Sequence, residues 1–166
     1  EKNIYNDQSI SALKDVLFGK KLSYNFDNVK ENKLGKTSGQ IVGGNLTLLH
    51  CLIGSKSSIN TDNKILFIED LGEYHYHIDR MLVSLRRAGY FDNCKGLIVG
   101  DFTDLRKNTT PFGKSLKEII LDAVKEFDFP VLFDFPAGHE KINMPIILGR
   151  DITMDINSSK SSINFL

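Results

Sequence analysis

The sequence contains no tryptophan, only two cysteines and four prolines in 166 residues, and its 21 basic and 21 acidic residues balance. A formal net charge of zero provides no general attraction to nucleic acid or to an anionic membrane surface. No apolar run approaches the roughly 18 residues that a membrane-spanning helix needs, and no signal-peptide pattern is present. These absences argue against a nucleic-acid-binding or membrane-spanning protein.

The two cysteines, Cys51 and Cys94, lie in apolar stretches and lack the spacing of metal ligands. Such a pair is typical of reduced thiols in a protein core. We therefore expect two buried, reduced thiols, as in a reducing compartment such as the cytoplasm.

Hydrophobic residues make up 41% of the chain, which is enough for a packed core. A length of 166 residues suffices for one domain and is short for two, so we expect a single domain over residues 1–166. Because the chain begins at Glu1 rather than Met, we also expect it to be a fragment or a processed product.

The stretch Ile65–Arg80 organises the chain. Four apolar residues, Ile65–Ile68, predict a strand buried on both faces, and the strand stops at two acids, Glu69 and Asp70. A helix that ends at Gly89 is predicted after them by apolar residues at helical spacing, namely Ile78, Met81, Leu82, Leu85 and Ala88. Open α/β sheets usually place ligands and chemistry at the carboxyl ends of such strands.

Other elements follow from the same patterns. Helices are predicted over Ile10–Leu17, after the N-cap Asn45, and after Ser115, which can form a capping box with Glu118. Strands are predicted at Lys21–Phe26, Ser38–Val42, Gly96–Gly100, Pro130–Phe133, Ile146–Leu148, Ile152–Ile156 and Ser162–Phe165. The predicted fold is α/β, with a mixed β-sheet and flanking helices.

His139 is the second informative position. It follows Gly138 in a loop after a strand, a common setting for a catalytic imidazole, although most loop histidines are merely solvated. If the strands before Glu69 and His139 are parallel neighbours, both residues reach the same edge of the sheet. A carboxylate that holds the Nδ1 proton of a histidine is the orienting half of a nucleophilic triad.

Two further groups allow more than one interpretation. Gly43, Gly44 and Asn45 could form a bare backbone turn that binds substrate, or Asn45 could simply cap the next helix. His75 and His77 are two residues apart, so on a helix they point in nearly opposite directions, and no third ligand is suitably spaced. We therefore expect no metal site and no cofactor.

Five segments in chain order carry a family resemblance. They are Gly43-Gly44-Asn45-Leu46, Ile65–Asp70 with Ile78-Asp79-Arg80, Gly96–Gly100, Gly138-His139 and Leu148-Gly149. Together they resemble the C-terminal domain of the LD-carboxypeptidase family, which includes muramoyltetrapeptide carboxypeptidase and the microcin C immunity peptidases. The resemblance extends over essentially the whole chain and implies a domain of the swivelling β/β/α type.

The resemblance implies a serine peptidase with a Ser-His-Glu triad carried on two domains. The family's glutamate corresponds to Glu69 and its histidine to His139, while its nucleophilic serine lies in an N-terminal domain that is absent from this chain. The sequence contains no G-x-S-x-G, and the nearest approach, Gly35-Lys-Thr-Ser38-Gly39, has the wrong spacing for a nucleophile elbow. We therefore expect this chain alone to be inactive.

The resemblance also implies a substrate and partners. The leading hypothesis is a cytoplasmic enzyme that removes a terminal D-amino acid from a murein tetrapeptide in cell-wall recycling, with the family's N-terminal domain as partner and pairing of full-length copies as a homodimer. An alternative is an immunity-type peptidase that cleaves an amide in a peptide-nucleotide antibiotic. A hypothesis of another class is a non-catalytic binding module.

Overall fold

The structure, a computed structural model, describes residues 7–107 and 109–166. Within them, the strands form one seven-stranded sheet in the order β1-β7-β6-β2-β3-β4-β5. The strands are β1 (Ser23–Asp27), β2 (Gly35–Asn45), β3 (Ile65–Leu71), β4 (Gly96–Thr103), β5 (Val131–Leu132), β6 (Asp151–Ile156) and β7 (Lys160–Phe165). The helices are α1 (Asp7–Leu17), α2 (Leu46–Leu52), α3 (His75–Arg87) and α4 (Leu116–Val124). This confirms the predicted α/β class and mixed sheet.

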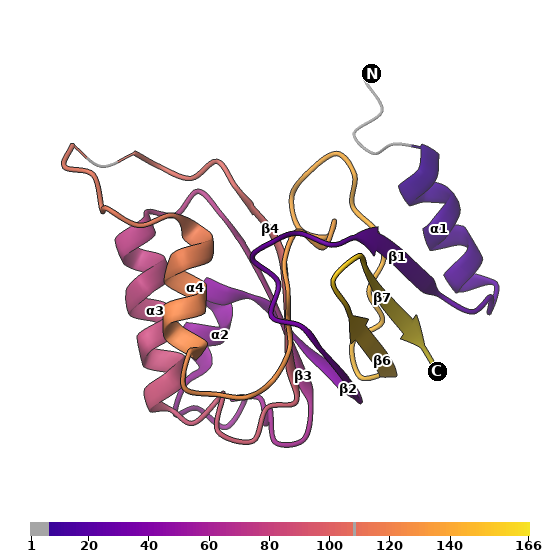
Figure 1. Cartoon of the computed structure of the whole chain (residues 1–166), viewed down its shortest axis with the longest axis horizontal. Coiled ribbons are helices and arrows are strands. Elements are labelled where there is room, and N and C mark those ends of the chain that lie inside the picture. The colour runs from indigo at the N-terminus through magenta and orange to yellow at the C-terminus, as the bar shows by residue number, and fades with distance from the viewer. Residues whose placement is uncertain (1–6, 108) are drawn as a thin grey trace.

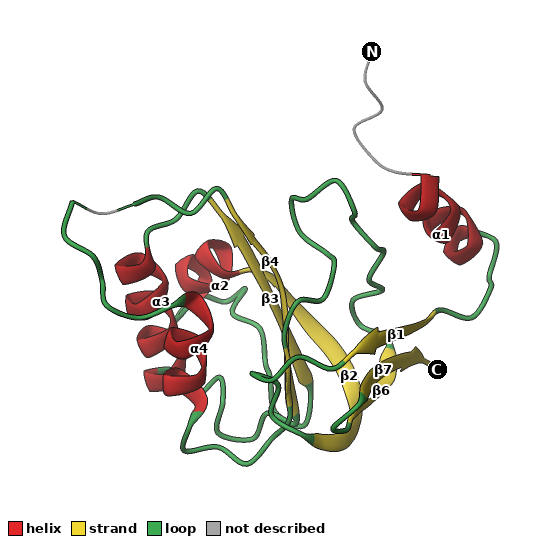
Figure 2. Cartoon of the chain, turned by 45° about the horizontal axis from the view of Figure 1, so that its top comes forward, coloured by secondary structure: helices red, strands yellow, loops and turns green. Residues whose placement is uncertain are grey.

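Strand β2 joins the two halves of the sheet. Its first part, Gly35–Gln40, pairs antiparallel with β6, and its second part, Ile41–Asn45, pairs parallel with β3. Beyond β3, strands β4 and β5 continue the parallel half, whereas β7 and β1 continue the antiparallel half. Figures 1 and 2 show the result as layers, with α2, α3 and α4 on one side of the parallel strands and the short antiparallel strands on the other.

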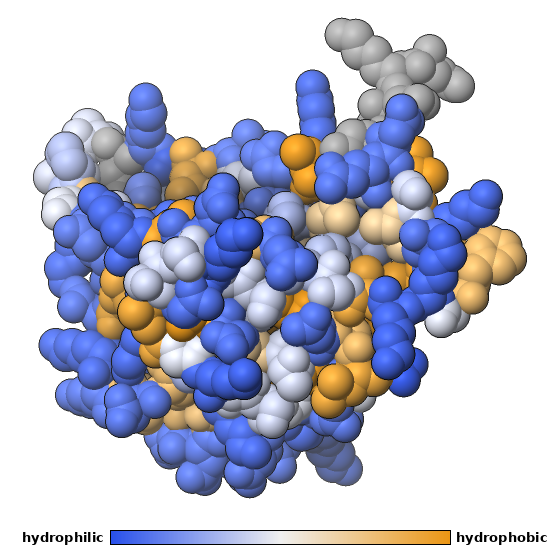
Figure 3. All heavy atoms as spheres, turned by 45° about the vertical axis from the view of Figure 1, so that its right-hand side comes forward, coloured by the Kyte–Doolittle hydropathy of each residue, from blue (hydrophilic) through white to orange (hydrophobic). Residues whose placement is uncertain are grey.

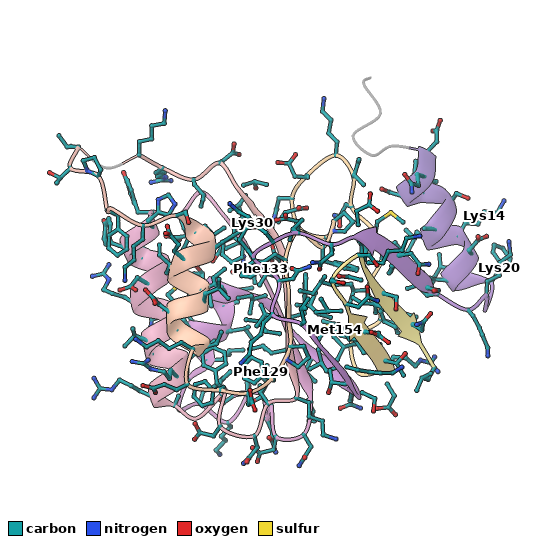
Figure 4. The ribbon with its side chains drawn as sticks, viewed as in Figure 1. Lys14, Lys20, Lys30, Phe129, Phe133 and Met154 are labelled. Atoms are coloured by element: carbon teal, nitrogen blue, oxygen red, sulfur yellow. The ribbon has the colours of Figure 1, made fainter. Side chains whose placement is uncertain are left out.

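Each side of the parallel strands has its own core. On the helix side, residues such as Leu66 and Ile68 of β3 pack against α2, α3 and α4, together with Phe129 and Phe133. On the other side, Phe67 packs in a cluster with residues of β1, β6 and β7, including Met154. Figure 4 shows Phe129 and Phe133 toward the helices and Met154 near β6. The double-sided burial explains why the central strands are continuous apolar runs.

The predicted helix caps are present. The Asn45 side chain accepts from the Leu48 N–H at the start of α2, and Ser115 and Glu118 form the capping box of α4. Helix α1 differs from a simple amphipathic helix, because its smaller residues Ala12 and Val16 face the core while its larger apolar residues stay accessible. Ile10, Leu13 and Leu17 are 50%, 50% and 76% exposed.

One predicted strand is wrong. Ile146–Leu148 forms no strand, because Leu148 and Gly149 make a turn, in which Gly149 has φ +83° and the Arg150 N–H donates to the Ile147 carbonyl. Ile146 and Ile147 still pack against the core that contains Phe67. The apolar run therefore belongs to a packed loop.

The expectation of two buried thiols is half right. Cys94 is buried, and burial raises the pKa of its thiol. Cys51 is exposed, because α2 is short and buries the side that carries Leu46 and Leu49. Over residues 7–107 and 109–166, no helix is long and apolar enough to cross a membrane.

Candidate active site

Glu69 and His139 meet at the carboxyl edge of the parallel strands. Glu69 lies near the end of the buried part of β3, and its Oε2 lies 2.8 Å from Nδ1 of His139 in the loop after β5. The Glu69 side chain is 10% exposed and that of His139 is 42% exposed. The predicted proximity is therefore confirmed, at a distance within the range of a formed hydrogen bond.

Asp70 points to the opposite face, as expected for the next residue of a strand. It is 2% exposed, and its carboxylate accepts from Asn45 Nδ2 at 3.0 Å, from the Thr47 backbone N–H at 3.0 Å and from Thr47 Oγ1 at 2.8 Å. Because Thr47 lies in the first turn of α2, its backbone N–H has no acceptor within the helix, and Asp70 supplies one. Of the two adjacent acids, only Glu69 contacts the imidazole.

Asn143 holds the backbone just before His139. Its Nδ2 donates to the Gly138 carbonyl at 2.9 Å, and its Oδ1 accepts from the Gly138 N–H at 3.3 Å. The Asn143 N–H in turn donates to Ser9 Oγ of α1 at 3.0 Å. This two-sided contact fixes the peptide at Gly138 and with it the direction in which His139 leaves the backbone.

An irregularity in β4 lies beside this loop. Ile68 pairs with Val99, but Asp70 pairs with Phe102, so β4 contains one extra residue opposite Glu69. Bulges of this kind often occur next to active sites, where they redirect a side chain. The residues at the bulge are Gly100 and Asp101, and Gly100 has no room for a side chain because a Cβ there would lie 2.3 Å from the Ala137 carbonyl oxygen.

A pocket of about 480 Å³ opens beside Glu69. Its walls include Ser9, Ile10 and Leu13 of α1, Phe67 of β3 and Gly138 of the histidine loop. Figure 3 shows apolar side chains at the surface on the side of the molecule that carries α1. The volume is within the usual range for sites that hold small ligands.

The Gly43-Gly44-Asn45 segment lies next to β3, with Asn45 paired to Glu69 in the register of the sheet. Gly43 is required for packing, because a Cβ there would lie 1.9 Å from the Phe67 carbonyl oxygen. Gly44 has open space around its Cβ position, and Asn45 caps α2 while donating to Asp70. The capping interpretation of Asn45 is therefore confirmed, and a role in substrate binding stays a prediction.

A second histidine–carboxylate contact lies at the start of α3. His77 Nδ1 of that helix lies 2.7 Å from Oε2 of Glu73, which precedes the helix. Among residues 7–107 and 109–166, no three His, Cys, Asp or Glu side chains are grouped so that they could hold a metal ion.

The arrangement has the chemistry of a general base. When the Glu69 carboxylate accepts from Nδ1–H, the neutral imidazole presents Nε2 as its acceptor, and no described side chain is hydrogen-bonded to Nε2. An imidazole in this tautomer can take a proton from a hydroxyl, and the carboxylate stabilises the imidazolium that forms.

Comparison with known proteins identifies the family of the chain. A profile for the LD-carboxypeptidase C-terminal domain matches residues 38–154. The chain belongs to the LD-carboxypeptidase family. A Bacillus subtilis protein named probable murein peptide carboxypeptidase is 35% identical to it over 121 residues, which is 73% of this chain and 38% of that protein. The microcin C7 self-immunity protein MccF of Escherichia coli is 27% identical over 165 residues, which is 96% of this chain and 46% of that protein.

The fold of this LD-carboxypeptidase domain is also that of solved relatives. The crystal structure of muramoyltetrapeptide carboxypeptidase from Oxalobacter formigenes superimposes with a TM-score of 0.88 and 22% identity, covering 96% of this chain and 55% of that one. This chain spans less than half the length of the Bacillus subtilis and Escherichia coli relatives described above.

Two residues at this site were not predicted from the sequence. Asn143 and Asp101 both contact the histidine loop. A polar residue four positions after His139 was the available signal for Asn143. Asp101, directly after the predicted strand Gly96–Gly100, was a carboxylate at a strand end and could have been weighed in the same way as Glu69.

Proposed function

We propose that this chain is the part of a serine-type LD-carboxypeptidase that supplies the base and the orienting acid of a Ser-His-Glu triad. The observation that carries the proposal is the 2.8 Å contact between His139 Nδ1 and Glu69 Oε2 at the carboxyl edge of the sheet. His139 takes the proton of a serine hydroxyl through Nε2 and returns it to the leaving amine. Glu69 holds the imidazole in the required tautomer.

The serine comes from the family's N-terminal domain in a longer protein. The accessible apolar residues of α1, namely Ile10, Leu13 and Leu17, and the pocket beside Glu69 supply a surface of the right character for that domain to cover. In the docked enzyme that domain brings its serine within reach of His139, whose side chain is 42% exposed. Full-length copies pair as a homodimer, and the enzyme works in the cytoplasm.

The substrate is a murein tetrapeptide, from which the enzyme removes the terminal D-amino acid during cell-wall recycling. The Gly43-Gly44-Asn45 segment is the part of this chain that contacts it, because Gly44 leaves the backbone bare next to the strand that carries Glu69. The main support for this substrate is the family membership together with the Bacillus subtilis relative named for murein peptide.

A second candidate substrate is an acyl amide of a peptide-nucleotide, since the immunity protein MccF matches 96% of this chain. The test is hydrolysis by a longer protein that contains an upstream Gly-flanked serine. D-alanine release from a tetrapeptide ending in L-Lys-D-Ala or diaminopimelyl-D-Ala supports the first substrate, and cleavage of the peptide-nucleotide alone supports the second. If the longer protein cleaves neither and binds a murein peptide without turnover, it is a binding module and the proposal fails.

This chain alone should fold and release no D-alanine, because it contains base and acid without a nucleophile. Release by the chain alone would contradict the division of the triad between two domains.

A further inference from the structure

Helix α1 is attached to the histidine loop through a buried hydroxyl. Ser9 is the one buried residue of α1, at 4% exposure, and it is polar. Its Oγ accepts from the backbone N–H of Asn143 at 3.0 Å, and the hydroxyl points toward Sδ of Met144 at 4.0 Å. Ser9 and Asn143 are 134 positions apart, so the contact ties together two segments that only the fold brings side by side.

Packing of α1 does not by itself explain a hydroxyl at this position. Ala12 and Val16, the other residues of α1 that face the core, are apolar. Alanine in place of Ser9 would favour the helix and would bury no polar atom. What the serine adds is an acceptor for the Asn143 N–H, which lies in an irregular loop and not in a helix or strand. The hydroxyl therefore serves the histidine loop more than it serves the helix.

The Asn143 side chain carries this contact on to the residue before His139. Its Nδ2 donates to the Gly138 carbonyl at 2.9 Å, and its Oδ1 accepts from the Gly138 N–H at 3.3 Å. Gly138 has φ +152° and no side chain to restrict its backbone, so the loop depends on outside contacts to hold this peptide in one orientation. Ser9 thus holds the backbone of Asn143, whose side chain holds the backbone of Gly138.

We propose that Ser9 is a positioning residue for His139, on which it acts through the Asn143 side chain. Ser9 touches neither the imidazole nor any reacting atom. Ile10, the next residue of α1, and Leu13 line the pocket of about 480 Å³, so α1 joins the surface that the N-terminal domain covers to the loop that carries the histidine. This coupling of domain docking to the imidazole rests on the proposed function, whereas the effect of Ser9 on the imidazole does not.

The test is the tautomer of His139 in this chain, measured from the imidazole ¹⁵N shifts above the titration of the ring and assigned by difference with His139→Gln. The wild type should be mainly the Nδ1–H tautomer, because Glu69 accepts from Nδ1. Ser9→Ala should lower the ratio of Nδ1–H to Nε2–H about threefold, less than the roughly fivefold effect of losing one ordinary hydrogen bond directly. Ser11→Ala, the matched control, changes an exposed serine of the same helix and should leave the ratio unchanged.

A double-mutant cycle separates this route from a general loosening of the loop. In Asn143→Ala the side-chain link to Gly138 is lost while the backbone N–H of residue 143 is kept, so adding Ser9→Ala should change the ratio by less than about 1.5-fold. If Ser9 acted by packing on Met144 instead, Ser9→Ala would lower the ratio equally in both backgrounds. If Ser9→Ala does not fold by circular dichroism, Ser9→Cys replaces it, because sulfur is a weak acceptor.

An unchanged ratio in Ser9→Ala, or in Ser9→Cys where that variant replaces it, would overturn the proposal. So would an equal decrease in both backgrounds, or an equal decrease in Ser11→Ala. In the longer protein, loss of activity in His139→Ala with full activity in Ser9→Ala contradicts the positioning role alone. A tautomer that responds as expected in a protein without peptidase activity contradicts the proposed function alone.

Discussion

Asp70 and Glu69 are adjacent acids, and the structure predicts that replacing them changes the free energy of unfolding to different extents. Asp70→Ala removes the acceptor of four donors, namely Asn45 Nδ2, the Thr47 N–H, the Leu71 N–H and Thr47 Oγ1. The Thr47 hydroxyl keeps a second acceptor, Glu73 Oε1 at 3.4 Å, so three donors lose their partner. Each donor left unpaired costs about 1–3 kcal/mol, and some regain water because α2 begins at the edge of the sheet. We therefore expect Asp70→Ala to lower the free energy of unfolding by about 3–5 kcal/mol.

Asp70→Asn should cost less, about 2 kcal/mol, because its amide oxygen can still accept from Thr47 while its amide nitrogen meets Asn45 Nδ2, donor against donor. Asn45 cannot turn its amide over to relieve this contact, because its Oδ1 already caps Leu48. Glu69→Gln, the matched control on the same strand, loses only a contact to a half-exposed imidazole and should change the unfolding free energy by less than about 1 kcal/mol.

The assay is equilibrium unfolding in urea at pH 7, read by circular dichroism. A decrease in the unfolding free energy of less than about 1 kcal/mol for Asp70→Ala would refute the reasoning, because three unpaired donors should destabilise the fold by more than that. A larger cost for Glu69→Gln than for Asp70→Asn would do the same.

Three further predictions concern the histidine loop and the fold around it. Gly138→Ala should lower the unfolding free energy by about 1–3 kcal/mol more than Gly44→Ala in urea, because both glycines have φ near +150° but only Gly138 touches Asp101; equal costs would show that the contact is unimportant. Asn143→Ala should lower the ratio of the Nδ1–H to the Nε2–H tautomer of His139 by ¹⁵N NMR, since it leaves the Gly138 peptide unclamped; an unchanged ratio would argue against the clamp. The raised pKa of Asp101 means that the folded state binds more protons than the unfolded state above about pH 4, so stability falls as pH rises through this range. Asp101→Asn should therefore be more stable relative to wild type at pH 7 than at pH 4, and a difference that shrinks with rising pH would contradict the sign.

The main elements could be predicted because their signals are local. Ile65–Ile68 is apolar without interruption because helices cover one face and antiparallel strands the other, and Asn45 and Ser115 are caps whose partners lie within three residues. Strand ends were harder to predict. Strand β4 continues to Thr103 because a bulge lets it keep pairing with β3 past Gly100.

The remaining misses depend on contacts between segments far apart in the chain. Ile146 and Ile147 are apolar because they cover the core that contains Phe67, which a loop can do as well as a strand. Glu69 could be predicted as a candidate because it follows an apolar run. Asp101 meets the histidine loop only where the loop after β5 folds back onto β4, which its neighbours in sequence do not show. Asn143 is the exception, because it contacts Gly138 within the same irregular loop, five positions away.

The central claim is that His139 and Glu69, and not Asp70, belong to the triad. The most direct test is the steady-state release of D-alanine from a murein tetrapeptide by the longer protein, at a temperature where every variant is folded. His139→Ala should reduce kcat/KM by about 10⁴-fold or more, and Glu69→Gln should leave a small residual rate, because the amide occupies the site but favours the wrong tautomer. Asp70→Asn should retain most of the activity, because Asp70 faces α2. An inactive Asp70→Asn enzyme beside a Glu69→Gln enzyme close to wild type would contradict the assignment.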